Sequence, residues 1–238
     1  MELNTYNNYY RTKNWNEIEN ARKSALRAFS VNYYHKNLLS LLFVVEMIYF
    51  YEGKKYEAEA LARYIVNLRP DSALAWHYWG LALLKLNLSV EAAECSDAGL
   101  KRNDYIKHKI ESELFCLKAL ALRGLGRYNE SIEYFEKAIE TKRCGNERDI
   151  GLIWGHYGIT LEAYAKEMEY KEEMEYKEYL IKAENAYKKA IKYFPEYIEV
   201  QTALTRLYKM REFCTKEEKD RFISKRCECA IENRAFKE

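Results

Sequence analysis

The stretch that decides the fold is AWHYWGLALLKLNLSVEAAECSDAGLKRND, residues 75–104. Its apolar residues recur at spacings of three and four, the spacing of one face of an α-helix. Gly80 is a small residue beside large aromatic ones, so we expect two helices to approach closely there. The positions that define the pattern are Trp76, Trp79, Gly80, Leu83, Ala92, Ser96 and Gly99. The stretch therefore predicts a pair of amphipathic helices.

The same pattern recurs along the chain. An earlier copy runs from Leu42 to Pro70, and a later one from Trp154 to Pro195. Ala119 and Gly158 are the small residues of two later copies that correspond to Gly80, so we expect close helix approaches there as well. The copies open at residues 42, 76, 115 and 154, so their spacings are 34, 39 and 39 residues. The copy that opens at residue 115 carries Phe115, Ala119, Leu122, Gly126, Tyr128, Ser131, Phe135 and Ala138. One helix pair cannot bury its apolar face alone, so this repetition indicates stacked helix pairs.

These residues resemble the tetratricopeptide-repeat family, whose pattern is Trp, Leu-Gly, Tyr, Ala, Phe, Ala and Pro. Pro70 and Pro195, the two prolines of the chain, both fall in the proline position and fix the register. The resemblance covers residues 3–210 and is strongest over 38–195. It implies an all-α fold, a right-handed α-α superhelix (TPR solenoid) of about five to six helix-turn-helix repeats with a C-terminal capping helix.

The predicted organisation is a single solenoid domain over residues 1–238. It comprises a degenerate first repeat (3–37), clear repeats (38–72, 73–106, 112–145 and 151–197), and a partial repeat with the capping helix (198–238). Thr215 and Glu218 form the capping-box signature that starts this last helix.

The copy that opens at Trp154 holds 13 additional residues, KEMEYKEEMEYKE, at 166–178. The insertion has no Gly, Pro or Asn, and Glu178 with Lys182 is one of its helix-supporting pairs at i, i+4. We therefore expect both helices of this repeat to be lengthened. Two interpretations of the insertion stay open, a solvated protrusion and an arm for a specific partner.

Composition narrows the class of protein. The 238 residues include 39 basic and 37 acidic ones, a net charge of +2, which argues against a general nucleic-acid binder. The six cysteines form no Cys-x-x-Cys and no zinc-finger spacing, so we expect free, mostly buried thiols. The sequence shows no signal-peptide core and no apolar run of about 20 residues, which favours a cytoplasmic or nuclear protein.

Motifs of catalysis are missing from the sequence, which has no His-Glu-x-x-His, no Gly-rich phosphate loop and no Gly-x-Ser-x-Gly. The four histidines, at 35, 77, 108 and 156, are scattered. We therefore expect no enzymatic activity, no cofactor and no metal, and we expect a protein or peptide as the partner.

The predicted binding surface is a concave groove lined by the first helix of each repeat. Most of its positions are apolar, which favours a partner helix or an extended apolar peptide. Counted from each tryptophan position, they are Phe43, Met47, Phe50, Tyr51, His77, Leu81, Leu84, Lys85, Leu120, Arg123, His156 and Ile159, with Cys116, Glu162, Arg206 and Lys209 added by the same count. Some family members clamp acidic C-termini with basic and amide side chains. The matching positions here are Phe43, Met47, Tyr78, Glu113 and Leu117, so that mode of binding is rejected.

The resemblance implies a protein-interaction scaffold or adaptor. A homodimer through the apolar helix 38–51, as a subunit of a larger assembly, is a further expectation. The alternative function is an RNA-binding helical-repeat protein, which rests on Lys101, Arg102, the cluster 107–109 and ten basic against seven acidic residues in 201–238. A regulatory subunit of an enzyme is the third reading.

Overall fold

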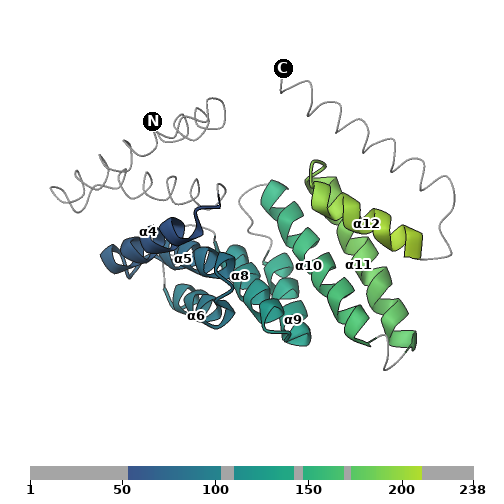
Figure 1. Ribbon diagram of the computed structural model, residues 1–238, viewed down its shortest axis with the longest axis horizontal. Helices are drawn as coiled ribbons and strands as arrows, with labels where there is room; N and C mark the ends of the chain where they lie inside the picture. Colours follow the sequence, from purple (N-terminus) through teal and green to yellow (C-terminus); the bar gives the residue numbers. More distant parts are fainter. Residues whose placement is uncertain (1–52, 103–109, 142–146, 169–172, 211–238) are drawn as a thin grey trace, which may run out of the picture. The chain divides into compact units, whose positions relative to one another are not determined.

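The fold is described from a computed structural model, over residues 53–102, 110–141, 147–168 and 173–210. Within these ranges all regular structure is α-helical, and turns join the helices (Figure 1). The all-α prediction is therefore confirmed. The predicted first repeat, the apolar helix 38–51 and the capping helix after Thr215 lie outside the described residues.

The chain divides into two compact units, the first ending at Leu125 and the second beginning at Gly126. The helices described in the first unit are α4 (Lys55–Leu68), α5 (Ala73–Lys85), α6 (Ser89–Leu100) and α8 (Glu111–Gly124). Along this unit α4 packs on α5, α5 on α6 and α6 on α8, and α5 also contacts α8. The first helices of two successive repeats, α5 and α8, are thus neighbours, as the stacking of helix pairs requires.

The helices described in the second unit are α9 (Tyr128–Glu140), α10 (Glu147–Met168), α11 (Glu173–Tyr193) and α12 (Ile198–Met210). Here α9 packs on α10, α10 on α11 and α11 on α12, and α10 also contacts α12 (Figure 1). The order of contacts repeats that of the first unit.

The helices that flank the insertion are the longest ones described. α10 has 22 residues and α11 has 21, whereas each of the others has 12 to 14. The predicted pair forms, with Lys182 Nζ 2.7 Å from a Glu178 carboxylate oxygen. The rings of Tyr164 on α10 and Tyr179 on α11 meet edge-on, 4.8 Å between centroids. The predicted lengthening of both helices is therefore confirmed.

Small residues stand where helices approach most closely. A Cβ atom added at Gly80 on α5 would lie 2.4 Å from Cδ2 of Leu117 on α8. Within the second unit, a Cβ added at Gly158 on α10 would lie 2.6 Å from the ring of Tyr187 on α11. Ala119, the third predicted small position, is fully buried. The close approaches expected at Gly80 and Gly158 are confirmed.

Both prolines stand three residues before the start of a helix, Pro70 before α5 and Pro195 before α12. The carbonyl of Pro70 accepts a hydrogen bond from Trp76 Nε1 at 3.0 Å. The carbonyl of Pro195 accepts one from Gln201 Nε2, again six residues later. Because Trp76 and Gln201 occupy the same position of their repeats, two different side chains hold the same turn. The register that the prolines fix is confirmed.

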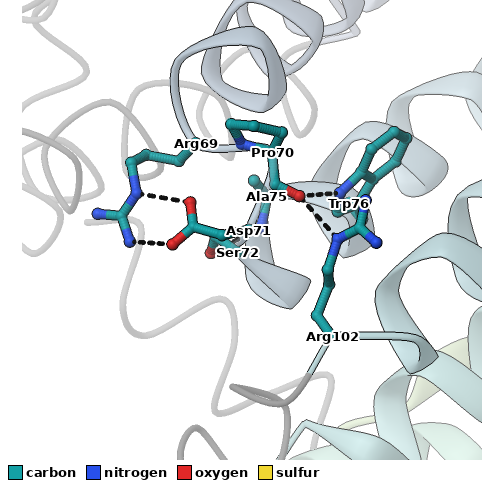
Figure 2. A network of polar contacts seen from close by, with 7 residues as sticks. All are labelled: Arg69, Pro70, Asp71, Ser72, Ala75, Trp76 and Arg102. Atoms are coloured by element: carbon teal, nitrogen blue, oxygen red, sulfur yellow. Dashed lines mark hydrogen bonds and ion pairs between the residues drawn. The ribbon is translucent and has the colours of Figure 1, made fainter.

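Figure 2 shows the first of these turns. Arg102, which follows α6, donates from Nε to the same carbonyl of Pro70 at 2.7 Å. Its guanidinium also lies over the ring of Trp76, 5.5 Å from the ring centroid. One exposed carbonyl thereby joins the start of α5 to the end of α6.

The residues between Pro70 and α5 are held by their own polar contacts. Arg69 donates from Nε and a terminal nitrogen to the two carboxylate oxygens of Asp71, both at 2.9 Å (Figure 2). The hydrogen bond from Arg69 lowers the pKa of Asp71. Ser72 caps α5, since its hydroxyl oxygen accepts from the backbone N–H of Ala75.

Candidate protein-interaction face

The predicted groove residues of the first unit lie on α5 and α8. All are at least partly exposed, namely His77, Leu81, Leu84 and Lys85 on α5 and Cys116, Leu120 and Arg123 on α8. We call this set the α5/α8 face. The two helices meet directly at Gly80 and Leu117, and both of these residues are buried. The structure thus brings the two helices together and leaves the predicted side chains accessible, while their binding role stays a prediction.

The α5/α8 face rests on a packed layer. Leu84 packs against a buried cluster of Leu83, Ala92, Ala93, Cys95 and Ala121. Behind the face, the hydroxyl of Ser96 on α6 donates to the carbonyl of Leu114 on α8 at 2.7 Å. Lys118 on α8 lies 2.5 Å from the Asp97 carboxylate on α6. A surface supported in this way is pre-organised, which lowers the entropic cost of binding a partner.

His77 is a titratable group of this face whose pKa is strongly perturbed by its surroundings. Its Nδ1 atom is buried without a hydrogen-bond partner among the described residues, and its ring meets the edge of Tyr78. Burial lowers the pKa of His77 to about 4. The imidazole is therefore neutral at neutral pH, and it acts as a weakly polar part of a mainly apolar surface.

The positions that match the carboxylate clamp cannot hold an anionic terminus in this unit. Leu117 is 1% exposed because it packs under Gly80. Glu113 is an acidic residue where the clamp requires a basic or amide side chain, and one of its carboxylate oxygens is buried. The exclusion of the clamp drawn from the sequence agrees with this placement.

In the second unit, His156 and Ile159 on α10 are half-buried, and the His156 ring meets the edge of Tyr197. Arg206 and Lys209 on α12 are exposed. These residues keep the partial accessibility that the prediction requires.

Glu162, which the same count placed on the groove, is instead buried. Its carboxylate accepts hydrogen bonds from Tyr187 on α11 at 2.8 Å and from Arg206 on α12 at 2.7 Å. Lys166, one turn later on α10, lies 3.0 Å away. Burial alone would raise the pKa of Glu162, but the hydrogen bonds from Lys166, Tyr187 and Arg206 outweigh it and lower the pKa. Glu162 therefore joins three helices rather than contacting a partner.

The remaining predicted groove residues, Phe43, Met47, Phe50 and Tyr51, lie outside the described residues. Cys95 and Cys116 belong to no disulfide, as predicted for them, and the other four cysteines fall outside the described ranges. In the part of the chain that the structure describes, no three His, Cys, Asp or Glu side chains come together as metal ligands. None of the helices in that part is long and apolar enough to cross a bilayer.

One feature of the surface escaped the sequence reasoning. Four lysines of α11 lie over aromatic rings, and they are Lys182, Lys188, Lys189 and Lys192. They follow one another at spacings of six, one and three residues, which keeps them on one side of a helix with 3.6 residues per turn.

Comparisons with known proteins agree with this architecture. The sequence model of the tetratricopeptide repeat matches residues 112–143, which span α8 and α9. No curated protein matches the chain. Among solved structures, the human IFIT1 dimer with PPP-AAAA has a TM-score of 0.66 at 14% identity, over 89% of this chain and 46% of that one.

Two further structures show the same fold. A chain of the APC/C hetero-tetramer Cut9–Hcn1 gives a TM-score of 0.62 at 16% identity, over 83% of this chain and 34% of that one. MamA gives a TM-score of 0.54 at 14% identity, over 80% of this chain and 96% of that one. This chain spans less than half the length of the IFIT1 and Cut9–Hcn1 chains. The chain thus contains a tetratricopeptide repeat at residues 112–143, and it shares its all-helical repeat fold with these structures.

Proposed function

We propose that the chain is a protein-interaction scaffold that binds a partner helix or an extended peptide on the first helices of its repeats. The observation that carries this proposal is the α5/α8 face. Its side chains are partly exposed and mostly apolar, whereas the adjacent Gly80 and Leu117 are buried in the contact between the two helices. Apolar anchors on a rigid helical framework suit the recognition of an amphipathic helix.

The same proposal includes His156 and Ile159 on α10 as contacts of the second unit. It also includes Phe43, Met47, Phe50 and Tyr51, whose apolar character suits a seam between two copies of the chain. The Cut9–Hcn1 hetero-tetramer and the IFIT1 dimer are protein assemblies that each include a chain with this fold, which supports a role in assembly.

RNA binding is the second candidate function, and it is favoured by the IFIT1 structure, whose ligand is PPP-AAAA. Against it stands Arg102, one of the basic residues on which the alternative rests. Its guanidinium is already held by the Pro70 carbonyl and the Trp76 ring. A binding constant that falls steeply with salt would favour RNA, and a weak dependence on salt would favour an apolar protein contact.

A selection of displayed peptides on the immobilised chain tests the proposed function. Selection is run in parallel on wild type and on Leu81→Glu/Leu120→Glu, which places two charges on the α5/α8 face. We expect sequences with apolar residues at i, i+3, i+4 and i+7 to be enriched on wild type and lost on the variant. Enrichment of the same peptides on both proteins would place their binding site elsewhere and contradict the proposal.

A further inference from the structure

The exposed side of α11 carries a row of lysines that rests on aromatic rings. Lys182 lies over Tyr179, Lys188 over Tyr208, Lys189 over Trp154 and Lys192 over Tyr193, at 5.0, 5.8, 4.0 and 6.0 Å from nitrogen to ring centroid. We call these four residues the lysine stripe. All four lysines are exposed, and the rings beneath them come from α10, α11 and α12. A ring below an ammonium group restrains its side chain and reduces the entropy lost on binding an anion.

Two lysines of the stripe have no ion pair among the described residues, Lys189 and Lys192. The other two pair with a carboxylate four residues earlier, Glu178 for Lys182 and Glu184 for Lys188, and Lys188 also hydrogen-bonds with Tyr208 on α12. The Lys182–Glu178 pair is exposed on both sides, and such an i, i+4 pair contributes about 0.3–0.5 kcal/mol, so it yields readily to a better-placed anion. The stripe therefore keeps positive charge for an external partner.

We propose that the lysine stripe is a second interaction surface and that its partner is an acidic segment of a protein. It lies on a second helix of a repeat, so it is separate from the first-helix surface proposed above. Lys182 and Lys192 are ten residues apart, which is about 15 Å along a helix and matches an extended segment of about five residues. Ile181 is 45% exposed on the same side of α11 and offers an apolar contact to that segment.

An acidic peptide fits the stripe better than single-stranded RNA does. Bases bind such surfaces by stacking on open aromatic faces. Here the lysines cover one face of each ring, Tyr208 is buried, and Trp154, Tyr179 and Tyr193 are half-buried. A carboxylate needs only the ammonium groups. The net charge of +2 also lacks the basic excess typical of nucleic-acid binders.

Fluorescence anisotropy with the full chain tests this proposal, using a labelled hexaglutamate peptide at about 50 mM salt. The test variant is Lys189→Glu/Lys192→Glu. The matched control is Lys55→Glu/Lys137→Glu, since these two exposed lysines also lie over tyrosine rings, 5.4 and 4.4 Å from the centroids. Both double variants change the net charge by −4, from +2 to −2. A milder variant, Lys189→Gln/Lys192→Gln, serves if the charge reversal prevents folding.

We expect the reversal at the stripe to weaken hexaglutamate binding by at least about tenfold and the Gln variant by about threefold. The control should change it by less than about twofold. Three results would each overturn the proposal: equal weakening by the stripe and control variants, no binding of hexaglutamate by wild type, or an oligoadenylate RNA bound through the stripe in place of the peptide.

Discussion

Glu162 on α10 and Arg206 on α12 lie 2.7 Å apart, from carboxylate oxygen to guanidinium nitrogen, although 44 residues separate them. The Glu162 side chain is 3% exposed and that of Arg206 is 52% exposed. The partnership is therefore unequal, because Arg206 can be hydrated without its partner and Glu162 cannot. Tyr187 and Lys166 supply the other donors, so one buried carboxylate links α10, α11 and α12.

Replacing Arg206 should destabilise the fold mainly through Glu162. We expect Arg206→Met to lower the free energy of unfolding by about 1–2 kcal/mol at neutral pH, because a buried carboxylate loses one of its three donors. In a Glu162→Gln background the same change should cost less than half as much. Urea unfolding of the four proteins of this double-mutant cycle gives both values. Additive costs would show that the two side chains do not stabilise each other.

The ion pair of Glu162 and Arg206 also makes the free energy of unfolding depend on pH. The pKa of Glu162 is lowered in the folded state, so its contribution is present above the unfolded value of 4.5 and is lost as the pH falls through the folded value. The stabilisation by Glu162 should thus be retained above pH 4.5 and decline below it.

Gly158→Ala should destabilise the second unit even though alanine is the better helix former. Alanine gains about 1 kcal/mol of helix propensity. Its Cβ, however, would lie 2.6 Å from the ring of Tyr187. That side chain is fully buried, and its hydroxyl donates a hydrogen bond to Glu162. We expect a net loss of about 1–2 kcal/mol in thermal or urea unfolding, since overpacking a core costs about 1–3 kcal/mol.

A second substitution separates sterics from backbone effects at Gly158. In a Tyr187→Leu background the ring is gone, so Gly158→Ala should become neutral or stabilising. If Gly158→Ala costs the same in both backgrounds, the close approach to Tyr187 is not the reason for glycine at this position.

These two sites show what sequence patterns can and cannot predict. The place of Gly158 in the repeat pattern predicted a close helix contact, and the prolines predicted the starts of α5 and α12. The periodic pattern predicts which face a residue occupies, and it placed Glu162 on the groove. It cannot report that Arg206, 44 residues later, and Tyr187 satisfy a buried carboxylate. Partners between helices depend on three-dimensional packing, which a repeat pattern does not encode.

His77 should make the first unit sensitive to mild acid. Its pKa is about 4 in the folded state against 6.5 as a free side chain, so the unfolded chain binds the proton more tightly. The stability that depends on a neutral His77 is then fully present above pH 6.5 and is lost as the pH drops from 6.5 towards 4. We expect this group to account for a loss of about 2 kcal/mol over that range, reduced from the full linkage value because the side chain is partly exposed.

Urea unfolding at several pH values checks the effect of His77. The curve of His77→Leu should be flatter than that of wild type between pH 6.5 and 4. Parallel pH curves for the two proteins would mean that the protonated His77 is hydrated in the fold, so that its protonation does not lower the free energy of unfolding.

The two described cysteines should differ in reactivity. Burial raises the pKa of Cys95 to about 12, whereas Cys116 is only partly buried and lies on the α5/α8 face. The thiolate is the reactive form, so N-ethylmaleimide should modify Cys116 in the native protein and leave Cys95 unmodified. Peptide mapping by mass spectrometry distinguishes them. Equal labelling under native conditions would indicate that α6 opens readily.

The central claim, that the α5/α8 face binds a partner peptide, is tested most directly by one titration. A labelled peptide selected on wild type is titrated by fluorescence anisotropy against wild type, Leu81→Glu/Leu120→Glu and Val90→Glu/Leu125→Glu. The last variant is the control, since Val90 and Leu125 are apolar, 54% and 40% exposed, and outside the face. We predict a loss of affinity of at least about tenfold for the face variant and less than about twofold for the control. Equal affinities for all three proteins, or equal losses in both variants, would contradict the account.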